Sequence, residues 1–208
     1  MGRPAKHQMD EVRKRAMRLF WEHGSEGVTT RDLEEALDLR APAIYRRFGS
    51  KEALFLSSVD YYIDTVIAGR VQSMLDGSED PIRGLHTFFM TALEPPVHQR
   101  HLRGCLLVNT ATHADGQLPA VNAALARGWN LVDQGFQRTL RRAQAKGQID
   151  AEHDPAALSQ ALLMSLQGLL TVARANIVDP RPGLDATFRL LGAATCSASE
   201  GSTTPTRA

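Results

Sequence analysis

Apolar residues recur every three or four positions along most of this 208-residue chain, as they do on one face of an α-helix. Met9, Val12, Ala16, Leu19 and Phe20 form one such series. No segment alternates β-branched with polar residues, and no Asn-Gly or Asp-Gly turn joins two segments of that kind. The pattern therefore predicts an all-α protein.

Glycine, proline and polar linkers interrupt this periodicity and divide the chain into about nine helices. Gly24 and the pair Gly49-Ser50 end the first and third of them. Thr30 is expected to cap the second, with Glu34 near the spacing of a capping box. The helices are expected over residues 9–24, 31–37, 42–48, 50–75, 81–93, 103–113, 118–146, 155–177 and 183–194.

The first 50 residues contain three short helices, and about four residues separate the second from the third, as in a helix-turn-helix unit. The sequence thus predicts a helix-turn-helix domain over residues 1–52 and a larger helical body over residues 53–196. Residues 197–208 are small and polar, so we expect them to form a disordered tail.

Positive charge is concentrated around this unit although the formal net charge of the chain is only +1. Residues 40–51 contain four basic residues and no acid, and residues 1–21 contain six basic residues and two acids. Basic side chains on a recognition helix and its flanks neutralise DNA phosphates. The charge alone also fits an ordinary solvent-exposed helix face.

Other patterns favour a cytoplasmic protein that is neither an enzyme nor bound to a membrane. The two cysteines, Cys105 and Cys196, form no C-x-x-C pair, and the basic N-terminus lacks the apolar stretch of a secretory signal. The most apolar segment, residues 156–178, contains Arg174 and several polar residues, so we expect a buried helix there. No phosphate-binding loop, G-x-S-x-G or HExxH motif is present, and we expect no cofactor.

Residues 9–56 carry a more specific pattern. It consists of Phe20-x-x-x-Gly24, Thr30-x-Asp32-Leu33 and the string Ile44-Tyr45-Arg46-Arg47-Phe48-Gly49-Ser50-Lys51-Glu52-x-Leu54. The pattern closely resembles the TetR family of transcriptional regulators. The resemblance implies a homodimeric repressor that binds a palindromic double-stranded DNA operator through this unit. It also implies a ligand-binding and dimerisation body that releases the operator when a small-molecule effector binds.

The resemblance and the chemistry of the side chains together point to DNA-contacting residues. The hydroxyls of Thr30 and Tyr45 suit phosphate oxygens, and Lys51 resembles the phosphate anchor of the family. Arginines and a small apolar residue near the start of the recognition helix suit base edges in the major groove. Arg3, within Gly2-Arg3-Pro4, resembles a minor-groove arm. The candidate DNA-binding residues are Arg3, Thr30, Arg31, Arg40, Ala43, Tyr45, Arg46 and Lys51.

The turn before the recognition helix departs from the family pattern. Asp38 and Arg40 stand where the family carries glycine and a serine or threonine cap. Aspartate tolerates the left-handed conformation better than most residues, so the turn can survive. Losing the serine cap is expected to cost about 1 kcal/mol, which Pro42 partly offsets. The departure keeps open an alternative function as a small-molecule-binding adaptor without specific DNA binding.

In the body, apolar and aromatic residues at helical spacing are candidates for an effector pocket. Phe89, Trp129 and Phe136 would form apolar walls, and Asn109 would orient a mostly hydrophobic ligand. The alternative is that these aromatic residues are ordinary core. By resemblance to the family, the helices over residues 155–177 and 183–194 would form the dimer interface.

Cys105 is a candidate sensor. Gly104 is expected to open a helix, which places Cys105 in its first turn beside Arg103, where a thiol becomes more reactive. The segment over residues 104–109 resembles that of NemR-like, electrophile-responsive members of the family. The alternative is a buried small hydrophobic residue. Cys105 and the nearby histidines lack helical metal-ligand spacing, so we expect no metal site.

Overall fold

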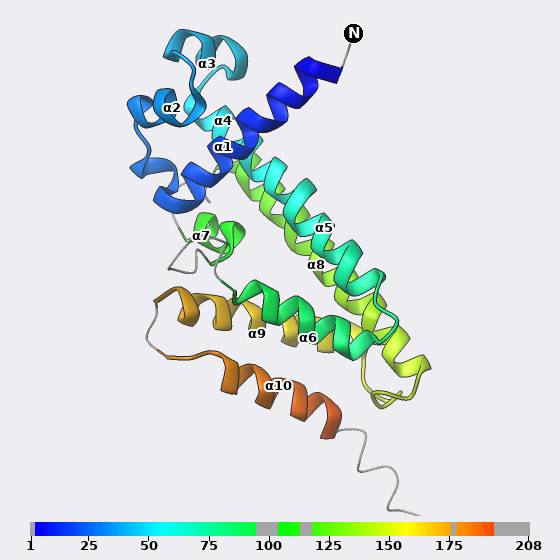
Figure 1. Ribbon diagram of the computed structural model, residues 1–208. Helices are drawn as coiled ribbons and strands as arrows, with labels where there is room; N and C mark the ends of the chain where they lie inside the picture. The colour runs from blue at the N-terminus through cyan, green and yellow to red at the C-terminus, as the bar shows by residue number, and fades with distance from the viewer. Residues whose placement is uncertain (1–2, 95–103, 113–117, 176–177, 194–208) are drawn as a thin grey trace, which may run out of the picture. The chain divides into compact units, whose positions relative to one another are not determined.

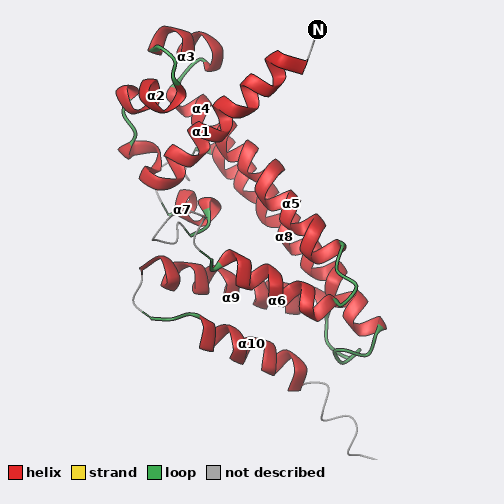
Figure 2. Cartoon of the chain, in the orientation of Figure 1, coloured by secondary structure: helices red, strands yellow, loops and turns green. Residues whose placement is uncertain are grey.

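The computed structural model describes residues 3–94, 104–112, 118–175 and 178–193, and every regular element within these ranges is helical (Figures 1 and 2). The predicted all-α class is therefore confirmed. The helices of the described residues are α1 (Arg3–Gly27), α2 (Thr30–Leu37), α3 (Ala41–Phe48), α4 (Lys51–Tyr62), η1 (Ile63–Ile67), α5 (Ala68–Arg70), η2 (Val71–Asp76), α6 (Pro81–Ala92), α7 (Leu106–Ala111), α8 (Pro119–Ala145), α9 (Pro155–Ala175) and α10 (Arg181–Ala193).

Four of these elements follow one another without a break, so that α4, η1, α5 and η2 make one continuous helix from Lys51 to Asp76. Counted in this way, the described residues form nine helices, as the sequence predicts. The turns η1 and η2 are π-helical. Apolar periodicity cannot distinguish them from α-helix, and such turns are frequent at functional sites.

The chain divides into two compact units, one formed by residues 1–69 and 103–131 and the other by residues 70–102 and 132–208. This division concerns packing. The predicted domains over residues 1–52 and 53–196 concern function, and they stay a prediction. The predicted disordered tail, residues 197–208, lies outside the described residues.

In the first unit, α1 and α4 pack closely together. Phe20 and Phe55 meet edge to face with ring centroids 5.2 Å apart, and Ala16 and Val59 are fully buried. Gly24 adopts φ 71° and ψ 166°, which breaks the helical geometry of α1 before its last residues. The expected end of the first helix at Gly24 corresponds to this break.

In the second unit, aromatic side chains from three helices form the core. Phe136 of α8 lies 5.4 Å from Phe88 and 5.9 Å from Phe89 of α6, and Phe89 lies 5.4 Å from Phe188 of α10, measured between ring centroids. Two arginines of α8 hold the end of η2: Arg138 donates twice to the Asp76 carboxylate, and Arg142 donates to main-chain carbonyls that include that of Leu75. The Arg142 contacts pair carbonyls that a helix leaves without a partner at its end.

The exposed apolar surface of the second unit is concentrated on its last two helices. Met164 of α9 is 72% exposed and Leu190 of α10 is 74% exposed. Only 22% of the most apolar stretch of α9 is buried, although the helix is long and apolar enough to cross a membrane. The expectation that this helix is buried is therefore wrong for the single chain, because an apolar flank stays uncovered.

Candidate DNA-binding site and ligand pocket

The N-terminus of α2 is fixed by a capping box. The Asp32 N–H donates to the Thr29 hydroxyl at 3.2 Å, and the Thr29 N–H donates to the Asp32 carboxylate at 2.8 Å. The prediction that Thr30 caps this helix is therefore wrong by one residue, because Thr29 satisfies the free N–H group. Thr30 becomes the first helical residue, and its side chain is exposed. The Thr-x-x-Asp spacing in the sequence was the signal for this cap.

The turn between α2 and α3 depends on Asp38. This residue adopts φ 53° and ψ 44°, the left-handed conformation expected for it, and its N–H donates to the Glu34 carbonyl. Arg40 precedes α3 in an extended conformation, and its side chain makes no capping hydrogen bond. Instead, the Glu34 carboxylate accepts a 2.7 Å hydrogen bond from the Ala41 N–H. No local sequence pattern predicts this contact, because Glu34 and Ala41 are seven positions apart.

Two predicted phosphate ligands meet on the surface of the helix-turn-helix unit. The hydroxyls of Thr30, at the start of α2, and Tyr45, in α3, lie 3.0 Å apart. Arg31 and Arg46, which directly follow them in the sequence, are exposed, and so is Arg40; Ala43 is half-buried. The pair therefore brings together two polar groups, each of which keeps hydrogen-bonding capacity for a third partner.

The core beneath this surface is small. Leu33 of α2 and Ile44 of α3 are fully buried, as expected, whereas Phe48 is only half-buried. Lys51, at the start of α4, donates to the Val28 carbonyl at 2.9 Å and so links α4 to the segment before α2. An ammonium group has three donors, so two remain for other partners. Arg3 is the first residue of α1, and its side chain lies outside the described part of the chain.

The predicted effector residues fall into different environments. Phe89 and Phe136 are fully buried and stacked on one another, which is the packing of a core. Asn109 and Trp129 are half-buried, and both belong to the first compact unit. Cys105 is 8% exposed and precedes α7, so the expectation that it lies in the first helical turn is wrong.

The surroundings of Cys105 are those of a packed residue. The Tyr62 hydroxyl donates to its sulfur at 3.8 Å, and the Tyr62 ring meets that of Trp21 edge to face at 4.9 Å. Of its predicted basic neighbours, Arg103 and the preceding residues lie outside the described ranges. The described residues contain no cluster of metal-ligating side chains. His98, His101 and His113 lie outside those ranges as well, so the absence of a metal site stays a prediction.

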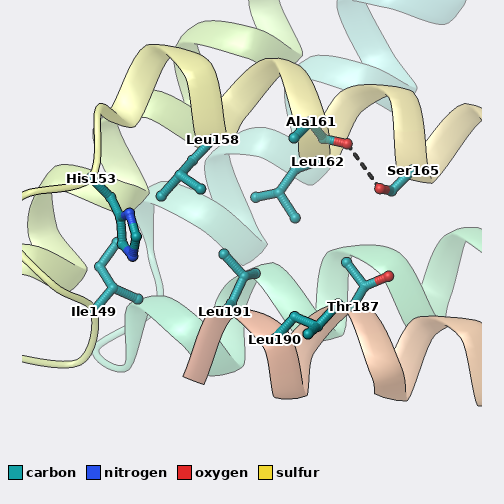
Figure 3. Close-up of a pocket in the computed structure, with 9 residues that line it drawn as sticks. All are labelled: Ile149, His153, Leu158, Ala161, Leu162, Ser165, Thr187, Leu190 and Leu191. Atoms are coloured by element: carbon teal, nitrogen blue, oxygen red, sulfur yellow. Dashed lines mark hydrogen bonds between the residues drawn. The ribbon is translucent and has the colours of Figure 1, made fainter. Parts of the chain in front are cut away.

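A pocket in the second unit is lined by other residues. It has a volume of about 320 Å³ and lies between α9, α10 and the segment that precedes α9 (Figure 3). Leu162 of α9 points towards Leu191 of α10, and His153 closes one end. The Ser165 hydroxyl donates to the Ala161 carbonyl, which leaves its lone pairs available. The lining residues are Ile149, His153, Leu158, Ala161, Leu162, Ser165, Thr187, Leu190 and Leu191.

Comparison with known families accounts for both parts of the chain. Residues 12–57 match the family described as bacterial regulatory proteins, tetR family, and residues 81–181 match the tetracyclin repressor-like C-terminal domain.

The chain belongs to the TetR family of transcriptional regulators.

Similar proteins agree with this assignment of a TetR-family, DNA-binding transcriptional regulator. The transcriptional repressor ComR of Escherichia coli K12 is 28% identical over 173 residues, which cover 83% of this chain and 82% of ComR. A cysteine mutant of the TetR-family regulator CifR, solved with 26-base-pair operator DNA, is 28% identical and has a TM-score of 0.74. That match covers 86% of this chain and 95% of the CifR chain. The reduced form of E. coli NemR has a TM-score of 0.76 at 16% identity, covers 89% of this chain and 95% of NemR, and shows the shared fold alone.

The capping box at the start of α2 should make the stability of this TetR-family protein depend on pH. Hydrogen bonds from the Thr29 hydroxyl and the Thr29 N–H hold the pKa of Asp32 below its ordinary value. The contribution is therefore present above the ordinary pKa of an aspartate and is lost as the pH falls through the lowered pKa. We expect Asp32→Asn to lower the midpoint of thermal unfolding at neutral pH and to change it little in acid.

Glu35→Gln is the matched control, because it removes an exposed carboxylate from the same helix without removing a cap. Thermal unfolding followed by circular dichroism over a pH series measures the effect. A difference between wild type and Asp32→Asn that is constant from neutral to acid pH would contradict the account.

Proposed function

We propose that this TetR-family protein is a homodimeric repressor in the cytoplasm, which leaves a palindromic operator when a small, mostly apolar effector binds. The observation that carries the proposal is the hydroxyl pair of Thr30 and Tyr45, 3.0 Å apart, beside exposed arginines. In this arrangement the two hydroxyls hold a phosphate group between α2 and α3, while the arginines approach base edges and neighbouring phosphates.

The roles of the individual side chains follow from their positions. Arg40 and Arg46 offer planar guanidinium groups to guanine in the major groove, and Ala43 offers a methyl group to thymine. Arg31 and Lys51 contact phosphates on either side of the recognition helix. The minor-groove role of Arg3 rests on the sequence of Gly2-Arg3-Pro4 alone. The exposure of Arg40 and Arg46 supports their part of this assignment.

Arg46→Ala is expected to weaken operator binding and to relax base preference at one position of each half-site. Losing a bidentate guanine contact costs about 1–3 kcal/mol, which is roughly a 5- to 150-fold loss of affinity. Fluorescence anisotropy at physiological salt, with operator and scrambled duplexes, measures both effects. Arg83→Ala, an exposed arginine of α6, is the control. Equal affinity of wild type and variant for the operator would overturn the assignment.

Dimerisation through α9 and α10 is supported by their uncovered apolar side chains. Met164 and Leu190 are each more than 70% exposed in the single chain. Val172 and Val178 are two further exposed apolar side chains. An apolar surface of this kind is typical of an interface. Two subunits also match the geometry of a palindrome, whose half-sites lie about 34 Å apart on one face of the duplex.

Met164→Glu is expected to shift the protein from dimer to monomer, because the new carboxylate would be buried without a partner in the interface. Light scattering after size-exclusion chromatography should give twice the chain mass of 22.8 kDa for wild type and about that mass for the variant. Gln134→Glu introduces the same charge at an exposed site of α8 and serves as the control. A dimeric Met164→Glu protein, or a monomeric wild type, would contradict the proposed interface.

The pocket between α9 and α10 is the effector site that the described residues support best. Its volume lies at the lower end of the range for small-molecule sites, and its walls are aliphatic with a few polar groups. His153 can donate or accept a hydrogen bond, and the Ser165 and Thr187 oxygens can accept one. These features suit a small hydrophobic molecule with one hydroxyl or carboxylate group. Effector binding acts on the operator by favouring a state with lower affinity for DNA.

Ala161→Trp is expected to fill this pocket and to reduce binding of the apolar fluorescent probe anilinonaphthalene sulfonate at least several-fold. Ala126→Trp introduces the same side chain at an exposed site of α8, in the other compact unit, and is the matched control. Probe fluorescence titrated with each dimeric variant measures the difference. Equal probe binding by the two variants would contradict a ligand site here.

A thiol sensor at Cys105 is the second candidate for effector control, and the hydrogen bond from Tyr62 is the observation that favours it. Modification of the sulfur would displace the Tyr62 hydroxyl, and the Tyr62 ring contacts Trp21 of α1, close to the helix-turn-helix unit in sequence. The low exposure of Cys105 limits access to reagents. For this reason we place the pocket first.

A further inference from the structure

The recognition helix α3 begins without a cap of its own, and yet each of its first three residues is accounted for. The Ala41 N–H donates to the Glu34 carboxylate at 2.7 Å. Pro42 has no N–H group, and the Ala43 N–H donates to the Arg40 carbonyl at 2.8 Å. An ordinary capping side chain at position 40 would bond to the N–H of the second or third helical residue. Proline removes the first of these donors, and the Arg40 carbonyl already takes the second.

Glu34 also terminates the preceding helix. Its main-chain carbonyl accepts hydrogen bonds from the N–H groups of Asp38 and Leu39, the latter at 3.3 Å. Its side chain then crosses the turn to the first residue of α3. One residue of α2 therefore holds both ends of the turn. A carboxylate at this place also interacts favourably with the positive end of the α3 dipole.

We propose that Glu34 is the positioning residue of the recognition helix and that its cap across the turn frees Arg40 for DNA. This inference rests on the proposed operator binding. The side chain of a residue that caps its own helix is occupied by the capping hydrogen bond. The family pattern has such a residue, a serine or threonine, at position 40. Here the Arg40 side chain is exposed, and the described residues offer it no hydrogen bond or ion pair. It stands at the end of α3 that enters the major groove in helix-turn-helix proteins.

The partner of Arg40 is an acceptor oxygen or nitrogen of the duplex. A guanine edge and a phosphate group both supply such acceptors, but they affect the base dependence and the salt dependence of affinity differently. A guanine contact makes affinity depend on one base pair of each half-site. A phosphate contact lowers affinity for all sequences and contributes about one unit per subunit to the slope of log affinity against log salt.

The first experiment compares Glu34→Ala, Glu34→Gln and the matched control Glu35→Ala in the full-length dimer. Glutamine keeps an acceptor oxygen, and Glu35→Ala removes the same charge from an exposed neighbour. Hydrogen exchange of the Ala41 amide and the affinity ratio between operator and scrambled DNA are measured for each. We expect Glu34→Ala to lose Ala41 protection and to lower the ratio roughly 5- to 10-fold, as for a lost cap. Glu34→Gln should retain most of both, and Glu35→Ala should retain both.

The second experiment tests Arg40 separately. Arg40→Ser should leave the thermal midpoint unchanged, because the arginine side chain caps nothing, and should reduce operator affinity at least 5-fold. Relaxed preference at one base pair indicates a guanine partner, and a shallower salt slope indicates a phosphate. Wild-type affinity of Arg40→Ser, or Ala41 protection that is unchanged in Glu34→Ala, would overturn the inference. Failure of wild type to distinguish operator from scrambled DNA would instead overturn the proposed function.

Discussion

The angle between α2 and α3 is the constraint on which DNA recognition depends, and both hydrogen bonds at the helix ends and apolar packing fix it. Each helix has only eight residues, too few to be stable alone. Leu33 and Ile44 supply a small buried core, and the Glu34 carboxylate ties the first N–H of α3 to α2. Lys51 ties the start of α4 to the carbonyl before α2. Leu33, Ile44 and Glu34 thus hold the exposed surface from beneath, where DNA need not touch them.

The architecture and the helix-turn-helix unit could be predicted from the sequence because local rules determine them. Helical periodicity, the Gly49-Ser50 break and the tolerance of Asp38 for a left-handed conformation each act within a few residues. The cap of α2 was misplaced by one residue because Thr29 and Thr30 are both threonines and only the Asp32 partner distinguishes them. The Glu34 contact could not be predicted, since a bond across seven residues depends on the turn geometry.

The candidate ligand pocket was harder to predict, and the reason is physical. Phe89 and Phe136 recur at helical spacing whether they line a cavity or fill a core, and here their rings stack in a core. The pocket is formed by side chains that lie up to 42 positions apart, from Ile149 to Leu191, most of them ordinary aliphatic residues. Only the packing of α9 against α10 brings them together, and no motif marks that packing. The sequence also could not show that one flank of α9 is exposed, because an apolar helix has the same residue pattern whether its own chain or a second copy covers it.

Selection of genomic fragments by the purified protein tests the central claim most directly. The protein is mixed with fragmented source DNA at physiological salt and excess competitor, where nonspecific electrostatic binding is weak. The account predicts that the recovered fragments share a palindrome whose half-site centres lie about one helical turn apart, or a multiple of it. Recovery of fragments without a shared sequence, from protein shown to be free of ligand, would contradict it and would favour a helical adaptor that does not read DNA.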